Sequence, residues 1–224
     1  MLKRIVFWGA TGHAKVLHEL MQDLGYVLVA LFDNNPDTLA PFPGVEIYHG
    51  EKGFREWRSR NENLETFCLV AIGGERGRDR VGILNFLTQN GVRPIIAVHP
   101  TASVAHSSIL SAGCQVLANA TISSSVLVGE ASIINTASSV DHESVLGRGV
   151  HIGPGATLAG CVRVGDYSFI GAGAVVLPRI KVGSDVIVGA GSVVTKDIPD
   201  RKVAFGNPAR IQRETFSSTA SHEQ

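Results

Sequence analysis

The chain has 224 residues and a formal net charge of 0, which allows two modest domains and gives no charge signature for binding nucleic acid or anionic membranes. It lacks a stretch of roughly 20 apolar residues, a signal-peptide pattern and a CxxC motif among its three cysteines, which argues against a membrane span and a disulfide framework. We therefore expect a cytoplasmic protein without a nucleic-acid or membrane partner.

Residues 1–97 alternate apolar runs with helical patterns. Residues 3–8 predict a buried strand, and the helical pattern that follows ends near Gly25, a residue suited to terminate a helix. Apolar runs at 27–32 and 67–72 predict two more strands, and residues 92–97 lead into the second half of the chain. This alternation indicates a small, parallel, Rossmann-like α/β domain.

The turn after the first predicted strand has the sequence GATGHAK, residues 9–15. Such a turn can place phosphates at a helix N-terminus, and Asp33 follows the second strand, where an acid that binds a ribose would lie. An NAD site is one alternative, although the glycine spacing differs from G-x-G-x-x-G. A tight turn without any ligand is another.

Residues 98–211 contain a six-residue repeat. Every sixth residue from Val98 to Val194 is Val, Ile or Leu, over seventeen positions without a slip. Small residues often stand two positions earlier, and glycine often stands one position later, as at Gly129 and Gly147. We expect three hexads to form one triangular coil of 18 residues, about five coils to stack as a parallel β-helix, and the slot of Gly129 and Asn135 to form corners with positive φ.

The repeat resembles the left-handed parallel β-helix of hexapeptide-repeat acyltransferases, and the segments at 193–199 and 206–210 resemble the closing segment of that superfamily. Both halves together resemble bacterial nucleotide-sugar acetyltransferases of the bacillosamine, perosamine and sialic-acid type over residues 2–211. The fold class that the resemblance implies is α/β plus β, with a nucleotide-sugar-binding domain at 1–97 and a β-helix acetyltransferase domain at 98–211. We expect residues 212–224 to form a disordered tail.

The resemblance also implies a homotrimer that binds acetyl-CoA between neighbouring coils, and it assigns the site residues. His142 would be the general base and Glu143 its partner. The residues implied to bind the cofactor are His151, Ala172 and Ala190. Those implied to bind the nucleotide sugar are His13, Ala14, Lys15, Asp33, Asn34 and Gly73.

The chemistry of the reaction suits the pair at His142 and Glu143. An amine that attacks a thioester must lose a proton, and an imidazole accepts protons efficiently near neutral pH. A neighbouring carboxylate favours the imidazolium that forms. His142 stands two residues after Val140, in a slot that does not fill the core, so a solvated surface histidine is the plain alternative.

Two other kinds of site are weighed against this pair. His106 and His142 are 36 residues apart, or two coils, as in the three-histidine zinc site of related β-helices, but the third ligand position holds Gly147. Two imidazoles leave a tetrahedral zinc ion short of ligands, so we expect no metal. Cys161 could carry an acyl group, but a lone cysteine without a positioned base favours a packed thiol and direct transfer.

The sequence therefore predicts an acetyl-CoA-dependent N-acetyltransferase acting on a nucleotide-linked 4-amino-4,6-dideoxy sugar. A UDP-linked acceptor is expected first, a GDP-linked perosamine-type amine next, and O-acetylation of a sialic acid third. A non-catalytic, trimeric scaffold that binds nucleotide sugars is the alternative from another class of protein.

Overall fold

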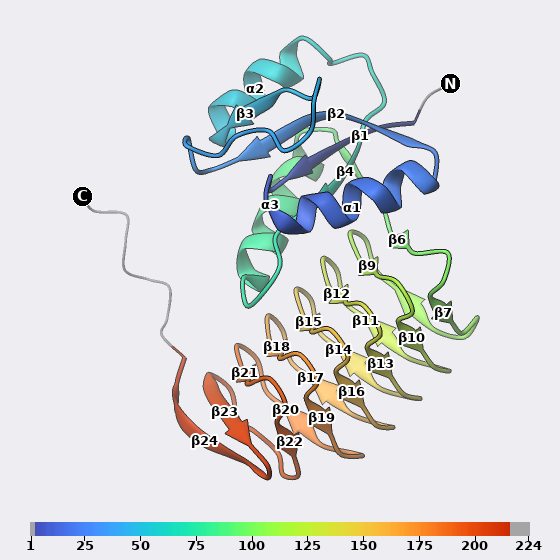
Figure 1. Cartoon of the computed structure of the whole chain (residues 1–224), viewed down its shortest axis with the longest axis vertical. Coiled ribbons are helices and arrows are strands. Elements are labelled where there is room, and N and C mark those ends of the chain that lie inside the picture. The colour runs from blue at the N-terminus through green and yellow to red at the C-terminus, as the bar shows by residue number, and fades with distance from the viewer. Residues whose placement is uncertain (1–2, 216–224) are drawn as a thin grey trace.

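The computed structural model describes residues 3–215 and shows an α/β domain above a parallel β-helix (Figure 1). The first domain contains a five-stranded parallel sheet in the order β3-β2-β1-β4-β5. Its strands are β1 (Lys3–Trp8), β2 (Tyr26–Asp33), β3 (Ile47–His49), β4 (Phe67–Val70) and β5 (Arg93–Pro94). Its helices are α1 (Gly12–Asp23), α2 (Gly50–Ser59) and α3 (Gly77–Gln89).

Each face of this sheet is covered by helix. On one face α1 packs Leu17 and Leu20 against β1 and β4, and on the other α2 and α3 pack Phe54 and Leu84 against the same strands. The predicted strands at 3–8, 27–32 and 67–72 correspond to β1, β2 and β4, and the predicted first helix is α1. The Rossmann-like prediction is therefore confirmed.

The second domain consists of two-residue strands in three parallel sheets. Sheet I contains β6 (Ala97–Val98), β9 (Gln115–Val116), β12 (Ile133–Ile134), β15 (His151–Ile152), β18 (Phe169–Ile170) and β21 (Ile187–Val188). Sheet II contains β7 (Ser103–Val104), β10 (Thr121–Ile122), β13 (Ser139–Val140), β16 (Thr157–Leu158), β19 (Val175–Val176) and β22 (Val193–Val194). Sheet III contains β8 (Ile109–Leu110), β11 (Leu127–Val128), β14 (Val145–Leu146), β17 (Arg163–Val164) and β20 (Lys181–Val182).

The interior of the β-helix follows the six-residue repeat. Each strand pairs with the strand 18 residues further on, so that Ile134 lies beside Ile152 and Val140 beside Leu158. The repeat aliphatics form one buried cluster, together with small residues from the slot two positions earlier. Ser132 in that slot donates a hydrogen bond to the carbonyl oxygen of Gly147, at 3.0 Å. The predicted left-handed β-helix is confirmed in its period, its core and its stacking.

The sequence predicted that the chain turns, with positive φ, at the position directly after each aliphatic, and this prediction was wrong. Positive φ angles occur three residues after the aliphatics, for example at Ala137 and Gly155, and neither Gly129 nor Asn135 has one. Gly129 is required for another reason, because a methyl group there would lie 2.5 Å from the backbone nitrogen of Arg148 in the next coil. Glycine in this slot permits close stacking of the coils, not a left-handed turn.

The chain closes the β-helix with a hairpin. Strand β23 (Lys202–Gly206) joins sheet I beside β21, and β24 (Ala209–Glu214) pairs with it in the antiparallel direction. The tail was expected to begin at residue 212, but Gln212 to Glu214 continue the strand, and Glu214 accepts a hydrogen bond from Lys202 at 2.6 Å. Residues 216–224 of the expected tail lie outside the described residues.

The first domain sits on the outer face of sheet I, and α3 lies along the edge that joins sheets III and I (Figure 1). Leu84 packs against the corner at Gly113, and Gly77, seven residues earlier, packs against the corner at Gly149, two coils further on. Seven helical residues rise about 10 Å, which matches two coils at about 4.8 Å each. The helix and the coils therefore fix each other's position. Among residues 3–215 no helix is long and apolar enough to cross a membrane.

The two kinds of glycine predict two different costs of substitution. Gly129→Ala places a methyl group against backbone of the next coil and should destabilise by overpacking, by about 1–3 kcal/mol or more. Gly155→Ala meets open space at φ +64° and should cost only about 1 kcal/mol. Thermal unfolding of both variants measures the difference. Equal losses, or a larger loss for Gly155→Ala, would contradict the assignment of these slots.

Candidate active site

A pocket of about 380 Å³ opens at the carboxyl ends of β1, β2 and β4. The sheet order is β3-β2-β1-β4-β5, so the strands that follow β1 in sequence lie first on one side of it and then on the other. The carboxyl ends of the strands at such a reversal are the usual ligand site of an open parallel sheet. Asp33, Asn34 and Gly73, which the family resemblance assigns to the nucleotide sugar, line this pocket, and Thr11 and Arg76 add polar groups.

Asp33 holds the glycine turn in place. One carboxylate oxygen accepts a hydrogen bond from the backbone nitrogen of Ala10, and the other accepts one from that of Asn35, both at 3.0 Å. Gly9 has φ +105°, and a side chain there would collide with the backbone of Ala71. The turn is thus shaped by backbone contacts on both sides of the pocket.

The other three residues assigned to the sugar lie on α1, outside this pocket. His13 turns toward the β-helix, where its Nε2 is 2.6 Å from Oε1 of Gln115. The amide of Gln115 in turn donates to the carbonyl oxygen of Val70, at 2.8 Å. Ala14 is fully buried in the core, so its side chain is not available to a ligand, and Lys15 is exposed.

His151 lies beneath the first domain and is only 5% exposed. Its Nδ1 is 3.1 Å from the carbonyl oxygen of Gly74, and its Nε2 is 3.0 Å from Nδ2 of Asn135. Burial, followed by the positive charge of Arg80, lowers the pKa of His151 to about 3, so the ring is neutral. An added Cβ at Gly73 would lie 4.0 Å from the ring, which places His151 behind the pocket wall.

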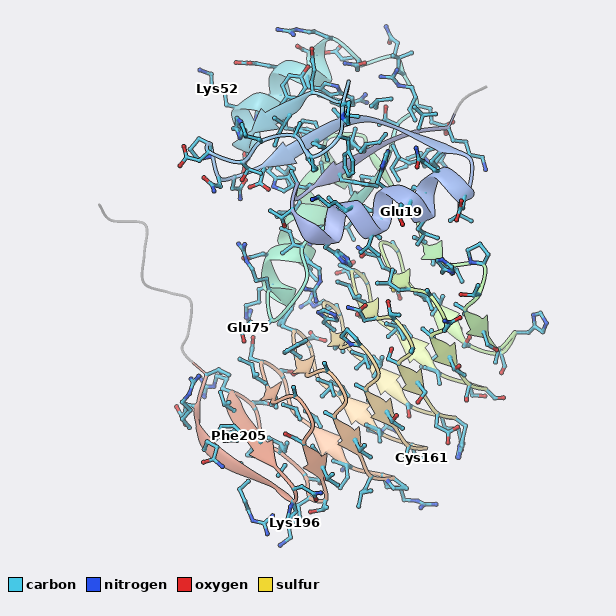
Figure 2. All side chains as sticks on the ribbon, viewed as in Figure 1. Glu19, Lys52, Glu75, Cys161, Lys196 and Phe205 are labelled. Atoms are coloured by element: carbon cyan, nitrogen blue, oxygen red, sulfur yellow. The ribbon has the colours of Figure 1, made fainter. Side chains whose placement is uncertain are left out.

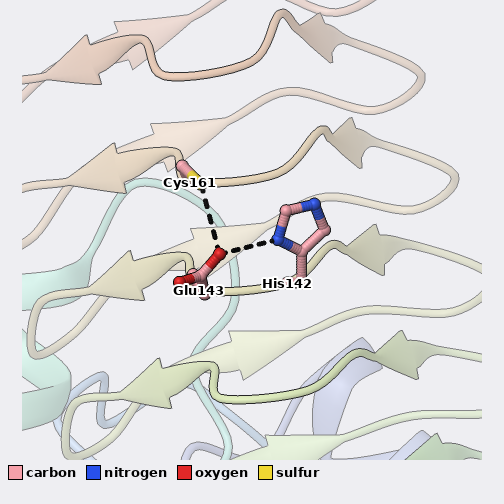
Figure 3. A group of neighbouring side chains, drawn as sticks. All are labelled: His142, Glu143 and Cys161. Carbon is pink, nitrogen blue, oxygen red and sulfur yellow. Dashed lines mark hydrogen bonds and ion pairs between the residues drawn. The ribbon is translucent and has the colours of Figure 1, made fainter.

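His142 and Glu143 lie at an exposed corner between sheets II and III, after β13 and before β14. Nδ1 of His142 is 3.1 Å from Oε2 of Glu143, and the same oxygen is 3.7 Å from the thiol of Cys161 in the next coil (Figure 3). The ring lies over Gly160, where a side chain would collide with it. One ligand atom from each of the three side chains falls within 4.8 Å of the others, a grouping that the sequence reasoning did not anticipate.

The residues assigned to one active site therefore occupy different faces of a single chain. His151 is on sheet I under the first domain, whereas His142 is on the edge between sheets II and III, away from sheet I. Figure 2 shows Cys161, the neighbour of this edge, on the side of the β-helix away from the first domain. Ala172 and Ala190 are exposed, one coil apart, on the edge between sheets I and II.

Two residues of the interface between the domains were missed in the sequence. Gln115 had a detectable signal, because it occupies the same outward slot of sheet I as His151, two coils earlier. Arg80 had none, because a single arginine in a helix of mixed polarity looks like surface. The structure buries it completely.

Comparisons with known proteins agree with this architecture. The family model described as PglD N-terminal domain matches residues 4–82, and the bacterial transferase hexapeptide model matches residues 143–178 and 161–196. Comparison with curated protein sequences gives no match.

Solved structures match along nearly the whole chain. A perosamine N-acetyltransferase from Caulobacter crescentus, in a variant with one histidine replaced by asparagine and in complex with CoA and GDP-perosamine, is 34% identical; the match covers 96% of this chain and 99% of that chain, with a TM-score of 0.87. The acetyltransferase domain of PglB from Neisseria gonorrhoeae FA1090, in complex with acetyl coenzyme A, is 31% identical over 95% and 100% of the two chains, with a TM-score of 0.81. Because the first of these relatives exceeds 30% identity over almost its full length, the chain belongs to the bacterial nucleotide-sugar acetyltransferases of the hexapeptide-repeat, left-handed β-helix class.

Proposed function

We propose that the chain transfers the acetyl group of acetyl-CoA to the amino group of a nucleotide-linked 4-amino-4,6-dideoxy sugar. The observation that carries this proposal is the match along 96% of the chain to an enzyme whose structure holds CoA and GDP-perosamine. That complex favours a GDP-linked acceptor over the UDP-linked one that the sequence placed first. The pocket at the ends of β1, β2 and β4 is the place for the nucleotide sugar, with Asp33, Asn34 and Gly73 around it.

In this proposal His142 takes the proton that the attacking amine loses. A carboxylate accepts hydrogen bonds, so Glu143 at 3.1 Å favours the form of the ring that carries its proton on Nδ1. Nε2 is then the free nitrogen and the base. The thiol of Cys161 contacts the carboxylate of Glu143 and has no hydrogen bond to the ring of His142, so that ring is not placed to activate it. The amine is therefore proposed to attack the thioester directly, without an acyl-cysteine. The three-ligand grouping at this corner is not required by the reaction.

We further propose that the enzyme is a homotrimer and that neighbouring copies complete each other's sites. The support is the separation of His142 from the pocket within one chain, since a base must reach the amine that it deprotonates. Sheet III also exposes two aliphatic side chains in successive coils, Ile109 at 62% and Leu127 at 42%, as an apolar strip suited to contact with another copy. In the trimer, Ala172 and Ala190 would flank acetyl-CoA, whereas the ring of His151, which the resemblance also assigned to the cofactor, is buried beneath the first domain with both nitrogens paired. The cytoplasmic location stays a prediction.

A CoA-release assay with a panel of UDP-, GDP- and dTDP-linked amino sugars tests the function. We expect release only with a 4-amino sugar, and fastest release with the GDP-linked form. Release with a sialic acid instead would favour O-acetylation. Binding of nucleotide sugars without any release would favour the scaffold and contradict the proposal.

Loss of the base should affect turnover more than binding. His142→Ala should lower kcat by roughly 10²–10⁴-fold, the effect of losing a positioned base. Both KM values should stay within a few-fold, because the ring is exposed at a corner and contributes to proton transfer more than to ground-state binding. Steady-state kinetics with both substrates measures this. A variant that keeps more than about a tenth of the wild-type kcat would refute the assignment.

Replacement of the partner carboxylate should have a smaller effect. Glu143→Gln keeps the size of the side chain but removes the charge that supports the imidazolium, so kcat should fall by less than in His142→Ala. Cys161→Ser is the matched control, because it contacts the same oxygen of Glu143 without touching the proposed chemistry. It should retain wild-type kcat. A larger loss in Cys161→Ser than in Glu143→Gln would argue against Glu143 as the functional partner.

Mixed oligomers test whether the site is shared between copies. His142→Ala removes the base, and Asn34→Trp fills the exposed rim of the pocket, so each variant alone should be inactive. If base and pocket come from different copies, randomly mixed trimers should recover about a quarter of wild-type activity. Light scattering should show three chains per particle. No recovery in mixed particles of verified composition would show that both halves of the site come from one chain.

A further inference from the structure

Arg80 is a buried cation that joins the two domains. It is fully buried, and its guanidinium donates to four backbone carbonyl oxygens. Two of these, Ile72 and Gly74, follow β4 and continue the pocket wall, both at 3.2 Å. The other two, Ala131 at 3.1 Å and Gly149 at 2.6 Å, are corners of the β-helix. Among residues 3–215 its guanidinium forms no ion pair.

The two corners present their carbonyl groups in equivalent positions. Ala131 and Gly149 are 18 residues apart in the same column of corners, and both have positive φ angles, 53° and 64°. At Gly77, the first residue of α3, an added methyl group would lie 2.8 Å from Cα of Tyr167. Backbone contact therefore fixes the start of the helix, and Arg80, one turn later, spans two coils.

The charge of Arg80 persists although it is buried. Burial lowers the pKa of Arg80 to about 10, which leaves the group protonated at neutral pH. A buried charge without a carboxylate is costly, and a well-packed apolar residue often stabilises a protein as much or more. Stability alone is therefore a poor explanation for a guanidinium at this position.

One carbonyl group links Arg80 to His151. The carbonyl oxygen of Gly74 lies 3.2 Å from Nη1 of Arg80 and 3.1 Å from Nδ1 of His151. Because a carbonyl oxygen only accepts, Nδ1 must carry the proton. In the neutral ring Nε2 is then an acceptor and takes a hydrogen bond from Nδ2 of Asn135, whose Oδ1 accepts from the nitrogen of Thr136 at 2.7 Å. Both ring nitrogens of His151 therefore have a partner of the matching kind.

Few groups around His151 can titrate. Helix α3 contributes Arg80, and α1 contributes His13, whose own pKa is lowered, chiefly by burial. The neighbouring strands of sheet I place Ile133 and Phe169 beside the ring, and neither carries a charge. Arg80 is therefore the one permanent charge that acts on His151 from the elements packed against it.

We propose that Arg80 is a positioning residue. Through the carbonyl group of Gly74 it holds His151 as the neutral tautomer protonated on Nδ1. Nε2 of His151 and the amide of Asn135 then form a fixed pair of polar groups behind the sugar-nucleotide pocket. The link to the pocket is Gly73, which lines it and approaches the ring of His151. A charged His151 would turn Nε2 into a donor and force the amide of Asn135 to reverse. The role at the pocket rests on the proposed function, but the protonation state of His151 does not.

The first test observes His151 in the wild-type protein labelled with [15N]histidine, with its signals identified by their loss in His151→Gln. We expect the Nδ1-protonated neutral tautomer between about pH 5 and 8. An Nε2-protonated ring or an imidazolium in this range would overturn the proposal. This measurement requires no catalysis, so it separates failure of the proposal from failure of the proposed activity.

The second test compares substitutions on α3. Arg80→Met removes the positive charge that, after burial, lowers the pKa of His151, so this pKa should rise in the titration of the [15N]histidine signals. Arg80→Lys keeps the charge and should restore the wild-type tautomer and the wild-type titration of His151 despite lower thermal stability. Arg78→Met is the matched control, because Arg78 binds Asp185 at 2.6 and 2.7 Å, on the same column of corners but away from His151.

The control should lower the melting temperature without changing the signals of His151. A folded Arg80→Met protein with the wild-type tautomer and titration would overturn the proposal. If Arg80→Met does not fold, Arg80→Lys decides, because loss of the tautomer in a folded protein that keeps the charge would equally contradict the role assigned to that charge.

Discussion

The unbroken 18-residue coil is the constraint on which the rest of the molecule depends. Because no residue is inserted between Val98 and Val194, equivalent positions of successive coils form straight columns, and each column has one environment. The aliphatic columns fill the interior, together with the small residues that stand two positions earlier. One column of corners is straight enough for a helix of the other domain to lie along it. A single inserted residue would break all of these alignments at once.

The same regularity divides the chemistry between faces. His142 and His151 are only nine residues apart, which is half a coil, so they face different sides of the prism. The first domain covers one of these sides and leaves the other to solvent. In the proposed trimer, base, cofactor and sugar would be gathered where two copies meet, so assembly would be a condition of the proposed activity.

The interface between the domains combines paired polar groups with apolar contacts. Gln115, His13, Arg80 and His151 satisfy one another or nearby backbone carbonyl groups, while Leu117 and Ile133 join the apolar core of the first domain. Buried polar groups that are all paired fix one arrangement, because any other arrangement leaves a donor or acceptor without a partner. This explains how two small domains can hold a pocket wall at a defined position.

The sequence by itself determined the fold class of both domains and the period of the β-helix, because an apolar run and a strict period are local properties of a chain, and the resemblance to a family supplied the pairing of His142 with Glu143. The sequence analysis misassigned the corner slot, because glycine is favoured both by a left-handed turn and by close stacking of backbones. Only the tertiary structure shows that Gly129 is required for close stacking. The sequence could not show that His142 and His151 lie on different faces of one chain, and its analysis overlooked Arg80. Those outcomes depend on which face a residue occupies and on what the other domain covers, and tertiary structure alone decides both.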